Sequence, residues 1–220
     1  AMNESVVQAG TLPCRGVACA AAFGHDPELL DTLDSVGLWY FAEVPHDTRV
    51  WRARVATALP PWSGRGPKPK RQRVVPSAPA PETVQALAEQ LPRQQWRQYV
   101  IQEGSQGPQL AEFAFVRVVA VRDELPGPEV TLVLRRSLTD GELKTYLCNA
   151  PASIPPQRLV RTSGMRWPIE SCFEVGKQEL GLGDYEVRSW RGWHHHMTLV
   201  LLAMAFLVRL QGRFSQTLRP

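Results

Sequence analysis

The pattern of apolar residues along the first 44 positions predicts a strand, a helix and a second strand. A run of small apolar residues over 15–22 ends at a Phe-Gly turn sequence. Apolar residues at helical spacing then cover 27–36, with Asp26 in the position of an N-cap. Another apolar run follows at 38–44. This order favours two parallel strands joined by a crossover helix.

Alternating apolar residues predict that the middle of the chain is rich in β-structure. Residues 60–81 lack the alternation, are rich in proline and glycine, and are expected to form an extended loop. A short helical pattern follows at 82–91. Beyond it, alternation and turn sequences such as Pro126-Gly127 predict an antiparallel sheet. Its strands are expected at 97–102, 110–121, 130–136 and 143–148.

The last third of the chain has helical patterns, which are expected at 156–163, 168–181 and 193–210. The most apolar run, 197–208, is shorter than the roughly 20 residues that cross a bilayer. It therefore predicts a buried core helix and no membrane partner. The order α/β, then β, then α divides the chain into three predicted parts: 1–63, 64–150 and 151–220.

Composition and charge narrow the class of protein. The chain is 44% hydrophobic, and its four cysteines form no Cys-x-x-Cys pair. This favours a cytoplasmic protein with reduced thiols over a zinc ribbon or a secreted disulfide scaffold. The net charge is only +4, but five cations lie within nine positions. They are Arg65, Lys68, Lys70, Arg71 and Arg73. Such a cluster is typical of a nucleic-acid-binding patch or of a solvated linker, and the sequence leaves both open.

One predicted helix carries three charged residues that suit phosphodiester chemistry. Glu170 and Lys177 are two helical turns apart on nearly the same face, and Arg166 lies one turn earlier. A carboxylate can hold Mg²⁺, while arginine and lysine bind phosphate oxygens. A surface helix with an Arg–Glu ion pair has the same spacing and is the alternative.

The spacing Arg-x3-Glu-x6-Lys is similar to the end of the Tyr-x2-Arg-x3-Glu-x6-Lys signature of insertion-sequence DDE transposases. The segment 17–27 resembles the strand and turn that carry the second aspartate of that family, and the resemblance covers about residues 15–212. It implies an α/β fold with a partial ribonuclease-H-like core. In that fold 1–63 and 151–220 form the core, the latter with the C-terminal helices, and 64–150 is a basic linker and β-rich insertion.

The resemblance also implies an activity, namely DNA cleavage and strand transfer with two Mg²⁺ (or Mn²⁺) ions held by three acidic residues. Glu170 would be the third acidic ligand, while Arg166 and Lys177 would hold the DNA backbone. Trp96, at the entrance to the insertion, would stack on an unpaired base, with sheet packing as the alternative. Transposon ends and target DNA would be the partners, with a homodimer or a mixed assembly with full-length transposase as possible assemblies.

Arg188 lies outside the signature. Its position beside two tryptophans suits either a phosphate contact or simple surface solvation. The same two alternatives apply to the basic cluster of residues 65–73.

The sequence departs from the family where catalysis would depend on it. Ala20 takes the place of the second aspartate, and a methyl group cannot bind Mg²⁺. Only nineteen residues precede Ala20, so we expect the first aspartate to be missing as well. Ser163 takes the place of the signature tyrosine. These departures predict a truncated or decayed transposase that is inactive alone. The alternatives are a non-catalytic DNA-binding module, an inhibitor of full-length transposase, or an interaction protein unrelated to DNA.

Overall fold

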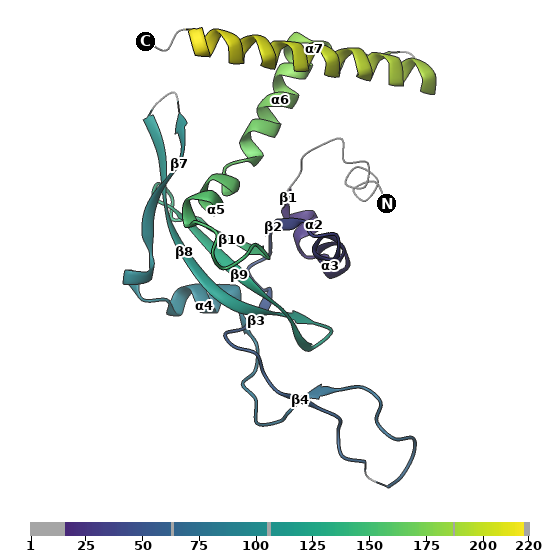
Figure 1. Cartoon of the computed structure of the whole chain (residues 1–220), viewed down its shortest axis with the longest axis vertical. Helices are drawn as coiled ribbons and strands as arrows, with labels where there is room; N and C mark the ends of the chain where they lie inside the picture. Colours follow the sequence, from purple (N-terminus) through teal and green to yellow (C-terminus); the bar gives the residue numbers. More distant parts are fainter. Residues whose placement is uncertain (1–15, 63, 105–106, 187, 218–220) are drawn as a thin grey trace. The chain divides into compact units, whose positions relative to one another are not determined.

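The computed structural model describes residues 16–62, 64–104, 107–186 and 188–217 (Figure 1). The chain forms two compact units, Ala1–Ser163 and Gly164–Pro220. In the described residues the first unit, here called the sheet unit, contains all the strands. The second, called the helical unit, contains two long helices. The boundary between these units falls between residues 163 and 164, so the predicted parts 1–63 and 64–150 share one unit.

The described part of the sheet unit is built on an eight-stranded mixed sheet in the order β1-β2-β10-β9-β8-β3-β6, with β7 paired to β8. Some neighbouring strands of this sheet come from distant parts of the sequence: β10 pairs with β2, and β3 pairs with β8. The bounds of these strands are β1 Gly16–Cys19, β2 Trp39–Glu43, β3 Arg49–Trp51, β6 Glu82–Thr83, β7 Arg97–Gly104, β8 Gly107–Arg122, β9 Leu125–Ser137 and β10 Leu143–Cys148.

The predicted strand–helix–strand unit is present at the start of the sheet. Strands β1 and β2 pair in parallel, with Gly16 opposite Trp39. Between them lie the one-turn helix α2 (Ala21–Gly24) and helix α3 (Pro27–Ser35). Leu30 and Leu33 on α3 are buried in the core, as their spacing predicts. The sequence pattern therefore located the crossover helix and the strands that it joins, but the first strand ends at Cys19, and residues 21 and 22, which were expected in it, begin α2.

Each face of the sheet packs against helices, which follows from alternation along the strands. On β9, Leu132 and Leu134 belong to the core cluster that contains α3 and α4 (Val84–Gln90). Val133, between them in sequence, belongs to a second cluster that includes Leu159 and Val160 of α5 (Pro156–Ser163). A short 3-10 helix, η1 (Arg93–Gln95), leads from α4 into β7. The sheet is thus buried on both faces.

The hairpin between β8 and β9 turns earlier than predicted. Asp123 and Glu124 form the turn, with φ angles of 49° and 63°, and a two-residue turn of this kind needs positive φ at both positions. The prediction of a turn at Pro126-Gly127 was wrong, since both residues lie in β9. A Cβ on Gly127 would lie 2.6 Å from Cγ of Arg122, so the glycine permits close approach of two strands.

Residues 57–74 form a long arm that extends from the sheet between β3 and β6 (Figure 1). It is closed at its base by strands β4 (Thr57–Ala58) and β5 (Arg73–Val74), which pair antiparallel. Next to this pair, Trp51 and Val55 are buried in a small cluster with Val119. The indole N–H of Trp51 donates to the carbonyl of Pro79 at 3.0 Å. The extended loop predicted at 60–81 is therefore a ribbon anchored at its base in a hydrophobic cluster.

The helical unit consists of α6 (Arg166–Glu179) and α7 (Trp190–Thr217). They approach closely at Gly176, where an added Cβ would lie 3.1 Å from Leu182 and 3.4 Å from the sulfur of Met204. The ring of His196 on α7 is hydrogen-bonded to the carbonyl of Gly181 at 3.0 Å. These contacts hold the two helices together within the unit.

The apolar run of α7 is mostly exposed rather than buried. Val200 is buried, whereas Leu199, Leu202 and Phe206 are exposed, so the prediction of a buried core helix was wrong for the described helix. The stretch Trp190–Leu210 is also longer than the predicted apolar run and, by length and composition, could cross a membrane. One such helix is weak support for a membrane segment, because core helices of soluble proteins pass the same test.

Candidate functional site

Helix α6 carries the three residues that the sequence singled out, at the spacing expected. Arg166 begins the helix, and Glu170 and Lys177 follow within it. Seven residues of α-helix advance about 10 Å and nearly complete two turns, so the backbone places positions 170 and 177 on one side. Lys177 is exposed. The side chains of residues 166–171, and with them those of Arg166 and Glu170, lie outside the part that the structure describes.

Ala20 occupies the junction of β1 and α2, where the resemblance expects the second aspartate. Its backbone is extended, with φ −68° and ψ 164°, and it is the N-cap residue of α2. Its carbonyl accepts hydrogen bonds from the N–H groups of Phe23 and Gly24, at 2.8 and 3.0 Å. The methyl side chain supplies no ligand atom. Burial raises the pKa of the preceding thiol, Cys19, so the neighbouring residue does not supply a thiolate either.

Gly24 explains the Phe-Gly pattern of this turn. A Cβ at this position would lie 1.8 Å from the carbonyl oxygen of Glu43, at the end of β2. No side chain fits such a gap, so glycine lets α2 press directly onto the strand. The turn thus fixes the position of Ala20 relative to β2.

Asp26 is a helix cap, as the sequence indicated. Its carboxylate accepts hydrogen bonds from the backbone N–H groups of Glu28 and Leu29, at 3.0 and 3.3 Å. These bonds satisfy two donors at the start of α3 that have no partner within the helix. Asp26 therefore has a structural role that accounts for its side chain.

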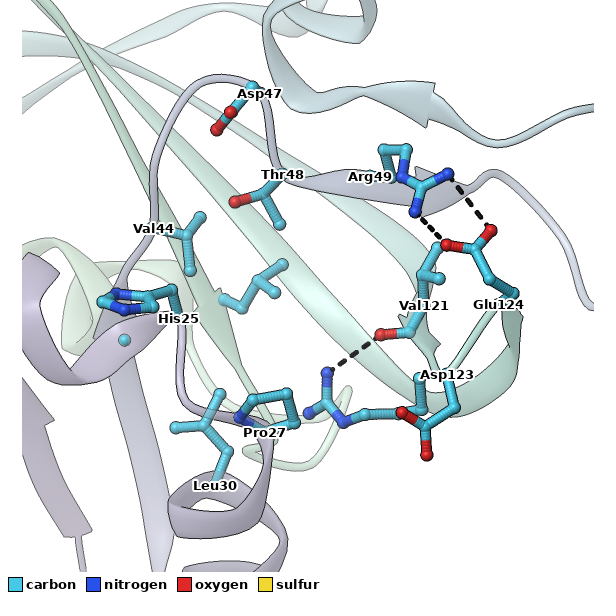
Figure 2. Close-up of a pocket in the computed structure, with 13 residues that line it drawn as sticks. His25, Pro27, Leu30, Val44, Asp47, Thr48, Arg49, Val121, Asp123 and Glu124 are labelled. Carbon is cyan, nitrogen blue, oxygen red and sulfur yellow. Dashed lines mark hydrogen bonds and ion pairs between the residues drawn. The ribbon is translucent and has the colours of Figure 1, made fainter.

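Beside the α2–α3 turn lies an open pocket of about 420 Å³, lined by residues from α2, α3, the β2–β3 connection and the β8–β9 hairpin (Figure 2). Arg49 points to Glu124 at one side of the pocket and makes two hydrogen bonds to the carboxylate. Arg122 donates to a carboxylate oxygen of Asp31 at 3.2 Å. Both cations of the pocket thus already have carboxylate partners. This pocket is a polar hollow rather than a phosphate-binding site.

The cations of the arm have a different environment from those of this pocket. The five that the sequence singled out are exposed, and among the described residues none pairs with a carboxylate. They are Arg65, Lys68, Lys70, Arg71 and Arg73. Residues 48–81 contain no aspartate or glutamate. The structure therefore brings these cations together on a ribbon that has no internal neutralising charge.

The arm also holds an aromatic residue that the sequence analysis did not select. Trp62 is 49% exposed, and its indole N–H donates to the carbonyl of Gly66 at 3.1 Å. The ammonium group of Lys68 lies 5.5 Å from its ring centroid. An isolated tryptophan within a run of prolines and cations was the available signal.

Trp96 lies in the core rather than on the surface. It is 8% exposed and packs in the cluster with α3 and α4. The guanidinium carbon of Arg136 lies 3.8 Å from its ring centroid, which covers one ring face. Sheet packing, the alternative named for Trp96, accounts for this arrangement. Stacking on a nucleobase would require Arg136 to move away.

Two further residues of interest differ in their accessibility. Ser163 is buried at the end of α5, and its hydroxyl donates to the carbonyl of Val160 at 2.6 Å. Its hydroxyl is therefore already used within the helix and is covered by the fold. Arg188 is exposed in the segment between α6 and α7, which is compatible with a phosphate contact and with solvation.

The residues at the positions that the resemblance assigns to metal ligands do not fit a pair of Mg²⁺ ions. Mg²⁺ requires oxygen ligands, and carboxylates are its usual protein ligands. Of the positions that the resemblance assigns, Ala20 offers a methyl group and Glu170 offers one carboxylate. Among the described residues no group of three histidine, cysteine, aspartate or glutamate side chains is placed to hold a metal ion.

Comparison with known proteins indicates a class of nuclease. Residues 2–108 match the model of a family described as DDE superfamily endonuclease. The match spans the β1–α3–β2 unit, the arm and the start of the β-rich region, slightly less than half of the chain. It supports a DDE nuclease- or transposase-like family, and such a family implies a DNA substrate. No curated protein and no solved structure matches the chain. The match ends before α6.

Proposed function

We propose that the protein is a DNA-binding member of the insertion-sequence group of DDE transposases, and that it does not cut DNA by itself. The observation that carries this proposal is Ala20, which stands at the β1–α2 junction, where the resemblance expects an acidic metal ligand. The family match over residues 2–108 supports the DNA substrate. The helical spacing of Arg166, Glu170 and Lys177 supports the group.

In this proposal the cations carry the interaction with DNA. Arg166 and Lys177 on α6 contact the phosphate backbone, and Arg188 adds a further contact. The arm adds its own set of cations, which have no carboxylate partners among the described residues. Because the contacts are to phosphates, binding is largely independent of sequence and depends on ionic strength. A protein of this kind would compete with an active transposase for DNA.

The absence of cleavage follows from the ligand set. In the family, Mg²⁺ or Mn²⁺ supplies the activated water and the charge stabilisation for cleavage. With alanine at position 20, the site lacks one of the carboxylate ligands that a pair of such ions needs. Chelation by EDTA should therefore leave the affinity for DNA unchanged, because the contacts that bind the backbone are arginine and lysine side chains.

A plasmid-nicking assay combined with DNA binding tests the proposal. The full chain and Glu170→Gln are incubated with supercoiled plasmid and either Mg²⁺ or Mn²⁺, and binding to a fluorescein-labelled duplex is measured by anisotropy. We expect no nicking by either protein and equal binding with and without EDTA. Nicking that is lost on Glu170→Gln would overturn the inactive assignment. Lack of binding at low salt would overturn the DNA-binding function.

A further inference from the structure

The tip of the arm fixes an aromatic ring at the surface. Trp62 is the only aromatic residue of the arm, and two positive-φ glycines, Gly64 (82°) and Gly66 (74°), follow it. These glycines permit the chain to fold back, which brings the carbonyl of Gly66 to the indole N–H. The ring is therefore held by a hydrogen bond within the loop while about half of its surface remains exposed.

The chemistry of the exposed ring is limited to its π surface. The N–H is the only polar group of an indole, and in Trp62 it is already used. Lys68 lies close enough to the ring for a cation–π interaction. A ligand that meets Trp62 therefore cannot hydrogen-bond to it and must pack against its face.

The charge of the arm identifies the ligand as a polyanion. Arg49, Arg52 and Arg54, which precede the arm, have partners: Arg49 binds Glu124, Arg52 binds Glu82, and Arg54 donates to the carbonyl of Gly127. The five cations of the arm itself are exposed. A flexible polyanion whose repeating units also present π faces is nucleic acid, and base–aromatic stacking with a cationic groove is how proteins bind single strands.

Base pairing decides which form of nucleic acid can use this ring. In an intact duplex both faces of a base stack on neighbouring bases, and separating one step takes a few kcal/mol. In a single strand, or at an unpaired end, a base face is free to stack on an aromatic side chain. We infer that Trp62 stacks on an unpaired base and that the arm binds single-stranded or unpaired DNA. This inference rests on the DNA-binding function proposed above.

The test compares two probes and three variants in the full chain. The probes are a fluorescein-labelled oligo(dT) strand and a blunt duplex of equal length. We expect Trp62→Ala to weaken binding of the single strand by about 5- to 150-fold, with less than about a twofold change for the duplex. Trp62→Phe keeps a stacking ring and should retain most of the affinity. Leu59→Ala is the matched control, because Leu59 is an exposed apolar residue of the same arm but has no π face.

Each failure of this test has a distinct meaning. If the unaltered chain binds DNA but Trp62→Ala leaves its single-strand affinity unchanged, the stacking role is wrong while the proposed function stands. If Trp62→Ala weakens both probes equally, Trp62 only shapes the arm, and the inference is overturned. If the unaltered chain binds neither probe, the proposed function itself fails. Binding of anionic phosphatidylserine vesicles in place of DNA would also overturn the inference.

Discussion

The salt dependence of DNA binding is the most quantitative consequence of the arm. Each phosphate that a protein neutralises contributes about 0.9 to the slope of log affinity against log salt for duplex DNA. The arm has five exposed cations without a carboxylate partner among the described residues. If all five contact phosphates, they contribute about 4.5 to this slope. A fourfold rise in salt then weakens their part of the binding by about 500-fold.

Replacing these five cations with alanine should remove this contribution and leave that of Arg166, Lys177 and Arg188. We expect the slope to fall by about 4.5, and by about 0.9 for a single Lys70→Ala change. Affinity is measured by fluorescence anisotropy with a labelled duplex over a series of potassium chloride concentrations. Circular dichroism establishes that the variants remain folded.

Arg52 provides the matched control for this experiment. It is also a cation of the same acid-free stretch, but it bonds to Glu82 at 2.5 Å and to Gln90 at 2.8 Å. Since its charge is already paired, Arg52→Gln should change the slope by less than about 0.9. A variant without the five cations that kept the original slope would refute the reasoning, because the arm would then not contact phosphates.

The remaining predictions concern the fold around the site. Gly24→Ala should lower the free energy of unfolding by about 3 kcal/mol, since a Cβ would lie 1.8 Å from the Glu43 carbonyl oxygen. A Cβ at Gly183 would meet open space, so Gly183→Ala should change the free energy of unfolding by less than about 0.5 kcal/mol. Both variants are measured by urea titration. Asp26→Ala should cost about 1 kcal/mol through loss of the α3 cap, and Asp26→Asn should retain most of it; equal losses would contradict the capping role. Burial raises the pKa of Tyr40 to about 12, against about 10 when unfolded. The free energy of unfolding should therefore be unaffected below pH 10 and fall by up to about 3 kcal/mol as pH rises to 12, whereas Tyr40→Phe should show a flatter alkaline profile.

Local sequence patterns were enough to locate the elements near the candidate site. The helix at 27–35 followed from apolar spacing and from the cap at Asp26, because both act within one or two helical turns. The register of Arg166, Glu170 and Lys177 on α6 followed from spacing for the same reason. The alanine at position 20, where the resemblance expects an aspartate, was likewise visible in the sequence, since the resemblance depends on residue identity and order.

The turn predicted at Pro126-Gly127 was wrong, and the sequence could not decide between base stacking and sheet packing for Trp96. Both features depend on contacts with residues that are distant in the sequence. Pro126-Gly127 has the composition of a turn, but the pairing of β8 with β9 places it inside a strand. Trp96 is buried because α4 and Arg136 pack around it. Composition alone cannot distinguish a Pro-Gly pair in a strand from one in a turn, or a buried tryptophan from an exposed one. Both outcomes are decided by contacts between residues far apart in sequence.

The amino-acid sequence alone determined the charge of the arm, the alternation of the strands and the helical position of Glu170, because these properties are carried by neighbouring residues. Only the tertiary structure decided that β10 joins β2, that Gly24 presses α2 onto the sheet, and that Trp62 rather than Trp96 has an exposed ring. The physical reason is that burial and strand pairing depend on which segments meet in space. A side chain becomes a candidate for binding only when the rest of the fold leaves its surface uncovered.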